Sequence, residues 1–225
     1  MVSVTAHTLG ECWQKCVQVV LKHGHEHNDE DVVIRELLGL SLQITNPCSE
    51  DSFIQEVGDH SVIAKMLKKF SKGVVMEDRP FTYGQLIYDM NGVDQFEWML
   101  ERLQKKPETK SATISLLTPG LDVPNLPCLS VLDAKIRNGQ VHLQFFFRSQ
   151  NIFGRQYANL LALSQLHEDL ARRSGCELGT MKGYVASAHI YDYDLAEAHE
   201  LAENGIGQIT DQYYSKGPAS IRAQT

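Results

Sequence analysis

The sequence contains no apolar run that approaches the roughly 20 residues needed to span a membrane. Its first residues, MVSVTAHTLGECWQKC, also lack the charged segment and the long apolar segment of a secretory signal. We therefore expect a cytoplasmic protein without a membrane partner.

Positive charge is also scarce. Lys and Arg number 21 against 28 Asp and Glu, and the formal net charge is −7. Proteins that coat nucleic acid neutralise its phosphates with clustered Lys and Arg, so we expect no stable nucleic-acid partner. Any anionic ligand must meet positive charge that is gathered locally.

The cysteines number five and lack the paired spacing of a zinc site. Because they are odd in number and scattered, we expect reduced thiols. His23, His25 and His27 alternate in an acidic, glycine-containing segment, where histidines are more often solvated than metal-bound. The sequence therefore predicts no metal site.

With 225 residues and 43% hydrophobic positions, the chain can bury one core. We expect a single domain over 1–225, with a loosely ordered tail at 205–225. Helical spacing of apolar residues predicts helices over about 9–21, 62–70, 93–103, 157–172 and 195–203. Alternation predicts strands over about 38–44, 112–117, 129–137, 140–147 and 180–190. Asn138-Gly139 is typical of a tight hairpin turn between two of these strands.

Cys128 lies in LPCLS, between a proline-rich loop and the start of an expected strand. A thiol at such a junction can be held rigidly and still reach a substrate. A single cysteine is more often a small buried hydrophobe, so its position alone leaves both interpretations open. A hydrolase that pairs Cys128 with His189 is a further alternative, but the sequence lacks the usual surroundings of such a pair.

Arg148 and Ser149 follow the apolar run FFF at the end of the expected hairpin. An arginine with aromatic strand neighbours is expected to be partly desolvated, which favours an interaction with phosphate or with a thiolate. Asn159 stands at a helix start, and His189 and Tyr191 stand at i and i+2 near a strand end; these side chains can donate hydrogen bonds to a sugar. Each of them can equally be a satisfied structural polar group.

Several segments, in order and with similar gaps, resemble the thymidylate synthase superfamily over about residues 83–191. They are Tyr83-Gly84-Gln85, VDQFEWMLERLQKKP, LPCLSV, FRSQNIFGRQYANLLALSQL and SAHIY. The short form, with an N-terminal helix leading into RELLGLSLQITNP, is more similar to compact archaeal-type synthases and nucleotide hydroxymethylases than to the long bacterial enzyme.

This resemblance implies an α+β fold with a mixed, bent sheet flanked by helices, and a homodimer packed through the sheet face. It implies one-carbon transfer from 5,10-methylenetetrahydrofolate to C5 of a pyrimidine nucleoside 5′-monophosphate. The Cys128 thiolate adds to C6 of the pyrimidine and so makes C5 nucleophilic. Arg148 helps to keep that thiolate ionised.

The resemblance also implies how the nucleotide is held. Arg148 and Ser149 bind its 5′-phosphate. Asn159 reads the pyrimidine edge, and His189 with Tyr191 holds the ribose 3′-hydroxyl.

Proton transfer near the base involves two further groups. Tyr83 orders water and protons there, and a carboxylate must also move protons. The family uses a glutamate upstream of its YG loop. Glu56 is the first candidate in this chain, and Glu77 is the alternative.

The chain departs from the family pattern at the phosphate and the folate. Where the family usually has two adjacent arginines that reach the partner's phosphate, this chain has Lys110-Ser111. The histidine that usually follows the nucleophile is Leu129. The aspartate that commonly meets the folate pterin is Asn151, which cannot form the same charge-assisted pair.

The expected lids of the folate cavity are missing. Trp13 and Trp98 lie in expected helices, and the region after Tyr191 lacks the long segment that closes over folate in the bacterial enzyme. Without lids, water captures the activated one-carbon group, which favours hydroxymethylation over reductive methylation. We expect a hydroxymethylase acting on CMP or dCMP, or on UMP or dUMP, in modified-nucleotide or nucleoside-antibiotic biosynthesis. A thymidylate synthase that converts dUMP to dTMP is the first alternative, and a non-catalytic nucleotide-binding homologue is the second.

Overall fold

The computed structural model describes residues 2–118, 120, 123 and 126–204, so the tail expected at 205–225 lies outside the described residues. The helices are α1 (Leu9–His23), α2 (Ser52–Val57), α3 (His60–Phe70), α4 (Tyr83–Tyr88), α5 (Gln95–Lys105), α6 (Gln156–Ser174) and α7 (Leu195–Glu203). The strands are β1 (Val2–Ala6), β2 (His25–Asp29), β3 (Val32–Ile44), β4 (Thr113–Ser115), β5 (Leu129–Arg137), β6 (Gln140–Asn151) and β7 (Glu177–Tyr191). A 3-10 turn, Asp192–Asp194, precedes α7.

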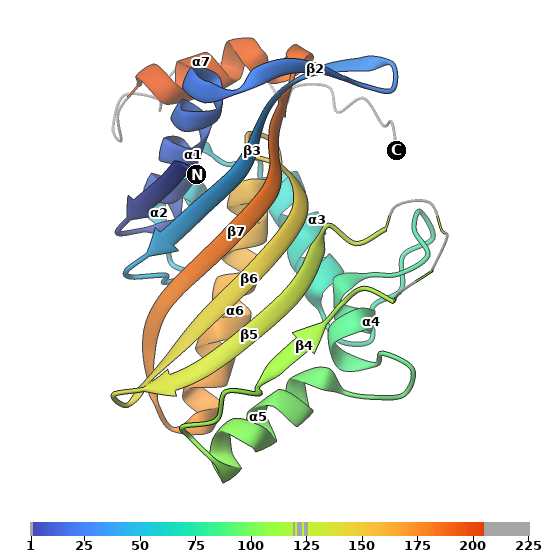
Figure 1. Cartoon of the computed structure of the whole chain (residues 1–225), viewed down its shortest axis with the longest axis vertical. Coiled ribbons are helices and arrows are strands. Elements are labelled where there is room, and N and C mark those ends of the chain that lie inside the picture. The colour runs from blue at the N-terminus through green and yellow to red at the C-terminus, as the bar shows by residue number, and fades with distance from the viewer. Residues whose placement is uncertain (1, 119, 121–122, 124–125, 205–225) are drawn as a thin grey trace.

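The strands form one mixed sheet in the order β1-β3-β7-β6-β5-β4, and β2 pairs with β3 outside this path. β1 runs parallel to β3 and β6 runs parallel to β7, whereas the other neighbours are antiparallel. The sheet is curved along its length (Figure 1). The expected α+β class with a mixed, bent sheet is therefore confirmed.

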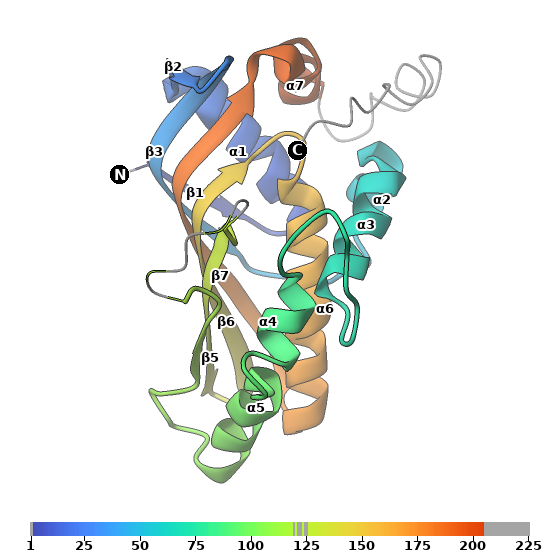
Figure 2. The same cartoon turned by 90° about the vertical axis from the view of Figure 1, so that its right-hand side faces the viewer.

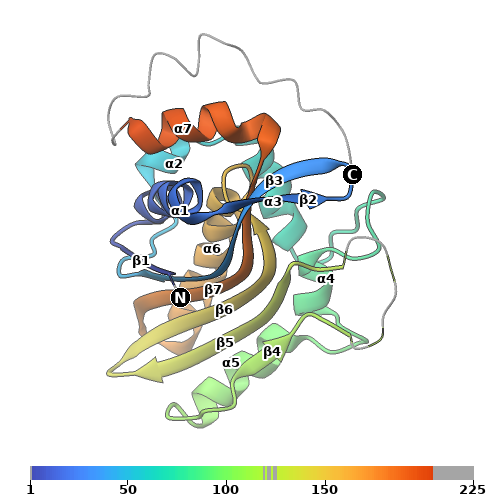
Figure 3. The same cartoon turned by 45° about the horizontal axis from the view of Figure 1, so that its top comes forward.

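The helices gather on one face of the sheet. Figure 2 shows α6 running along that face, with α3, α4 and α5 beside it. α7 packs across α1 (Figure 3), where Gln14 Nε2 donates to the Leu201 carbonyl at 2.9 Å. The opposite face carries no helix of the described chain.

Local sequence explains the ends of the central elements. α6 ends at Gly175, whose φ of +69° lies in the left-handed region that glycine adopts without strain from a Cβ. The β5–β6 turn places Asn138 and Gly139 at φ +52° and +75°, as a tight hairpin turn requires. The expected hairpin turn is confirmed, and the helix expected over about 157–172 extends to Ser174.

The uncovered face of the sheet is largely polar. Within the FFF run, Phe145 and Phe147 are buried in the core, and only Phe146 turns to the uncovered face. There its ring stacks on Tyr184 at 5.5 Å. Most neighbours on this face are polar, because side chains alternate along each strand: they include Asp133, Lys135, His142, Gln144 and Lys182.

The N-terminal part of the sheet is larger than expected. β3 starts at Val32 rather than near Leu38, and the histidine-rich segment is the exposed edge strand β2 rather than a loop. The described residues hold no cluster of His, Cys, Asp or Glu that could bind a metal ion. None of the described helices is both long and apolar enough to cross a membrane.

Candidate active site

Cys128 is half-buried and directly precedes β5, as the sequence predicted. The Arg148 backbone N–H donates to the Cys128 carbonyl at 2.9 Å, so the end of β6 fixes the backbone at the thiol. This pairing keeps the residue at a defined place beside the sheet while its side chain stays partly accessible.

The Arg148 side chain holds the segment before the thiol. Its Nε donates to the Pro127 carbonyl at 3.1 Å, and its Nη2 donates to the Leu126 carbonyl at 2.8 Å. The side chain is exposed rather than partly desolvated, which corrects the expectation drawn from its aromatic neighbours. Arg148 therefore anchors the cysteine loop and remains reachable from solvent.

Tyr83 is buried next to Cys128 at the start of α4. Its hydroxyl accepts a hydrogen bond from the Leu129 backbone N–H at 3.3 Å, directly after Cys128. The preceding Thr82 caps the helix in a capping box with Gln85, which fixes where α4 begins. Burial, with the nearby Cys128, raises the pKa of Tyr83 well above its usual value.

These residues surround one small cavity of about 160 Å³. It is lined by Lys69, Arg79, Phe81, Tyr83, Leu86, Leu126, Pro127, Cys128 and Arg148. The described lining thus combines one thiol and one phenol with cationic side chains and no carboxylate. The local positive charge that an anionic ligand needs is present, although the whole chain is acidic.

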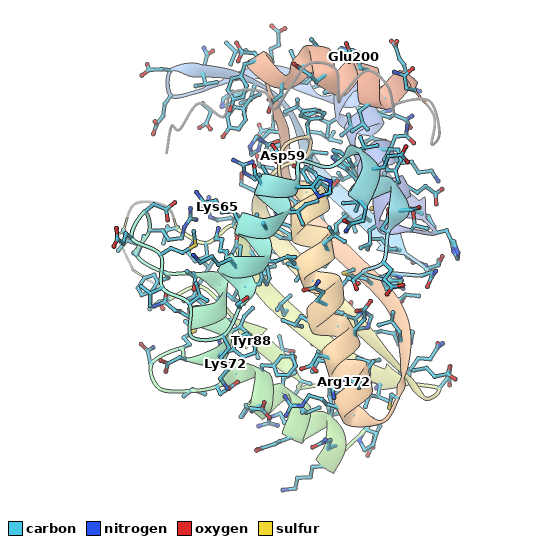
Figure 4. The ribbon with its side chains drawn as sticks, turned by 180° about the vertical axis from the view of Figure 1, so that it is seen from behind. Asp59, Lys65, Lys72, Tyr88, Arg172 and Glu200 are labelled. Atoms are coloured by element: carbon cyan, nitrogen blue, oxygen red, sulfur yellow. The ribbon has the colours of Figure 1, made fainter. Side chains whose placement is uncertain are left out.

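Lys69 and Arg79 were not singled out from the sequence. Lys69 belongs to the last turn of α3, where basic residues are common because they favour the helix C-terminus. Lys65, one turn earlier, is exposed at the side of α3 (Figure 4) and pairs with Asp78 at 3.2 Å. Lys69 instead sets its Nζ 4.2 Å from the Tyr83 ring centroid. Burial, with the nearby Arg79 charge, lowers the pKa of Lys69 to about 8.

The ends of β6 and β7 bring together the residues expected at the sugar. Because these strands are parallel with Asn151 opposite His189, Ser149 Oγ lies 3.5 Å from His189 Nδ1. His189 is buried, which lowers its pKa, and its ring meets that of Tyr191 edge-on at 5.2 Å. Burial also raises the pKa of Tyr191, and the nearby Cys128 adds to that rise.

Asn159 has an unsatisfied hydrogen-bonding group. The residue is only 5% exposed in the first turn of α6, and its Nδ2 donates to the Arg155 carbonyl at 3.0 Å. Its Oδ1 is buried without a hydrogen bond within the described chain. A buried acceptor of this kind is costly unless a donor meets it, so a ligand N–H suits this position.

Asn151 takes part in the turn that leads into α6. Its Oδ1 accepts from the Gly154 backbone N–H at 2.8 Å, and its side chain also hydrogen-bonds Asp194. Burial of the Asp194 carboxyl, with the nearby Glu197, raises its pKa to about 6. Asn151 stands where the family commonly has an aspartate. The structure places the partly desolvated Asp194 carboxyl next to it.

Three other candidates lie apart from the cavity. Glu56 is exposed on α2, and Glu77 is exposed between α3 and α4. Lys110 is exposed ahead of β4, and the antiparallel β4–β5 pairing puts Thr113 opposite Asp133, so Lys110 lies toward the end of β5 remote from Cys128. None of the three is among the described residues that line the Cys128 cavity.

Comparison with known proteins identifies one family. The family model described as "Thymidylate synthase" matches residues 51–210. A protein of Methanococcoides burtonii named "Putative thymidylate synthase" is 34% identical over 202 residues, covering 88% of this chain and 93% of its own. A protein of Methanosarcina acetivorans with the same name is 34% identical over 210 residues, covering 92% and 95%.

The matched residues include Cys128, Tyr83 of α4 and the polar ends of β6 and β7. The matched range also includes Lys69 of α3 and Arg79 of the loop between α3 and α4. The chain belongs to the thymidylate synthase family and is a one-carbon transferase that uses 5,10-methylenetetrahydrofolate.

Proposed function

We propose that this transferase hydroxymethylates C5 of a pyrimidine nucleoside 5′-monophosphate, with CMP, dCMP, UMP and dUMP as the candidate substrates. The observation that carries the proposal is Cys128, a half-buried thiol at a cationic cavity that stays accessible from solvent. The bound folate supplies the one-carbon unit.

The covalent chemistry starts at Cys128. Its sulfur forms a bond to C6, and the electron pair of the C5–C6 double bond makes C5 a carbon nucleophile. C5 would bond to the one-carbon unit that the folate supplies and lose its proton, and the bond from that carbon to the folate nitrogen would break to release tetrahydrofolate. Water then adds to the exocyclic carbon, and release of the Cys128 thiolate from C6 restores the ring.

The remaining residues hold the nucleotide. Arg148 and Ser149 bind the phosphate, and His189 with Tyr191 binds the ribose. The 3.5 Å approach of Ser149 to His189 supports one continuous phosphate-to-sugar site. Asn159 reads the base, since its free Oδ1 suits the N–H that either uracil or cytosine presents at this edge.

The folate fits beside Asn151. A pterin carries adjacent N–H donors, which a carboxylate pairs with well. The half-buried Asp194 carboxyl, hydrogen-bonded by Asn151, is a suitable acceptor. We propose that Asn151 acts on the cofactor by holding Asp194, while Tyr83 orders protons near the thiol.

A second candidate function is thymidylate synthesis from dUMP. The names of the two archaeal relatives favour it. It comes second because neither tryptophan is free to close over a folate: Trp13 is buried in α1 against Phe153 and Tyr157, and Trp98 stacks on Arg102 in α5. Reductive methylation needs a dry site for hydride transfer.

We further propose a homodimer through the uncovered face of the sheet. The absence of a described helix on that face and the stacked Phe146–Tyr184 pair support it. In such a dimer Lys110, which is remote from its own thiol, can approach the partner's phosphate site.

The test is release of tritium from C5 of each candidate nucleotide, with and without methylenetetrahydrofolate, followed by mass analysis of the product. We expect release with gain of a hydroxymethyl group. Cys128→Ala should abolish release but keep nucleotide binding, and Cys176→Ala, at another half-buried thiol, should retain it.

The other outcomes separate the alternatives. Gain of a methyl group from dUMP would establish the synthase. Undiminished release by Cys128→Ala would remove the thiol from the mechanism. Nucleotide binding without release from any substrate would favour a non-catalytic homologue.

A further inference from the structure

Three cationic side chains from separate segments line the Cys128 cavity. Lys69 comes from α3, Arg79 from the segment between α3 and α4, and Arg148 from β6. Like charges repel at such short range in a partly desolvated space. The cluster is therefore costly unless an anion balances it.

Arg148 alone cannot provide that balance for a doubly charged ligand. Two of its nitrogens already donate to the Leu126 and Pro127 carbonyls. Two of its five N–H donors thus hold the cysteine loop. The other three can reach a phosphate, but the single positive charge of Arg148 does not balance a ligand that carries about two negative charges and accepts several hydrogen bonds at once.

Arg79 is pre-oriented at the cavity. Its Nε and Nη2 donate to the two carboxylate oxygens of Asp78, at 3.2 and 3.0 Å. This fork fixes the plane of the guanidinium, and the side chain is only 20% exposed. A rigid, half-buried arginine suits recognition of an oxyanion.

Within the described residues, Lys69 makes no hydrogen bond or ion pair, whereas Arg148 donates to two carbonyls and Arg79 pairs with Asp78. Asp78 forms ion pairs with Lys65 and Arg79 rather than with Lys69. Lys69 instead rests on the face of Tyr83, and its lowered pKa of about 8 reflects burial and repulsion by Arg79. A bound anion would relieve both effects.

We propose that Lys69 and Arg79 bind the 5′-phosphate of the nucleotide from within the same chain. This inference rests on the proposed function, because Cys128 attacks the nucleotide. An anion bound in so small a cavity, next to the thiol, belongs to the molecule under attack. The carboxylates of a folate lie at the far end of a long molecule from its reacting carbon. Lys69 and Arg79 also supply positive charge in place of the two arginines that the family usually has where this chain has Lys110-Ser111.

The test compares a nucleoside monophosphate with its nucleoside. Lys69→Met and Arg79→Gln should each weaken monophosphate binding about tenfold or more in calorimetry, as loss of a charge-assisted contact does. Nucleoside binding should change less than about twofold. Lys69→Arg should restore most of the affinity, and Lys68→Met, an exposed neighbour on α3, should have no effect.

Inorganic phosphate gives a readout that needs no nucleotide. Phosphate should protect Cys128 from iodoacetamide in the wild type and fail to do so in Lys69→Met and Arg79→Gln. If phosphate shows this pattern of protection but the wild-type protein binds none of the candidate nucleotides, the anion site is supported and the proposed function is refuted.

Other results overturn the inference and leave the proposed function intact. Equal weakening of nucleoside and nucleotide would assign Lys69 and Arg79 to the base. Normal nucleotide affinity with weaker folate binding would assign them to the cofactor. Unchanged affinity for both would show that the pair binds neither.

Discussion

His167 makes the stability of this protein sensitive to acid. It lies on α6 with no exposed surface, and its Nε2 is 2.7 Å from the Val141 carbonyl. Because a carbonyl only accepts, Nε2 must carry the proton, and Nδ1 is a bare acceptor. Nδ1 is buried without a partner in the described chain, so protonation there creates a buried, unpaired charge.

The sign of the effect follows from the pKa. Burial lowers the pKa of His167 from 6.5 to about 4, with a smaller effect in the same direction from His142 and an opposing one from Glu168. The unfolded chain therefore binds the proton first as the pH falls below 6.5. Folding stability from this residue is intact above pH 6.5 and declines toward pH 4.

The magnitude comes from linkage between protonation and folding. At pH 5 the loss is RT ln[(1 + 10^1.5)/(1 + 10^−1)], which is about 2 kcal/mol, whereas at pH 8 it is about zero. His167→Gln keeps a donor near Val141 but removes the titration. The variant should therefore lose about 2 kcal/mol less than the wild type between pH 8 and pH 5.

Urea unfolding of both proteins at pH 8 and pH 5 measures this difference. His199→Gln, at an exposed histidine of α7, is the matched control and should follow the wild type. Equal losses in the wild type and His167→Gln would refute the buried-histidine argument, since ordinary carboxylate titration is common to all three proteins.

Two further predictions concern polar contacts outside the site. Asp51→Ala should cost about 2–4 kcal/mol in urea unfolding, because this buried carboxylate caps α2 at Ile54 N and accepts from Gly10 N at 2.7 Å; a loss below about 1 kcal/mol would contradict the cap. Arg173→Ala should cost only about 0.5–1 kcal/mol despite its two-pronged pair with Glu97, because both side chains are partly exposed. That loss should shrink in about 1 M salt, and salt-independence would argue against an ionic origin.

Elements set by local sequence could be predicted. The β5–β6 hairpin follows from Asn138-Gly139, and the end of α6 follows from Gly175, because both positions need positive φ. β2 could not be predicted in this way. All of its residues are exposed, so it has no apolar alternation, and only its pairing with β3 defines it.

The residues of the candidate site could also be predicted only in part. Cys128 and Tyr83 were found through sequence motifs, and the structure joins them through Leu129 N. Lys69 was missed because its neighbours in α3 are ordinary surface lysines. Only the packing of α3 against α4 sets it over Tyr83, and that packing involves residues distant in sequence.

The net charge of the chain and the local charge of its ligand cavity have opposite signs. The overall value of −7 opposes non-specific association with polyanions. The cavity reverses that sign locally, because its low-dielectric walls concentrate the field of cations drawn from α3, β6 and the loop before α4. None of these segments is basic enough to predict an anion site by itself. The position of the anion site is therefore decided by tertiary packing around Cys128, and composition limits only what the rest of the surface can bind.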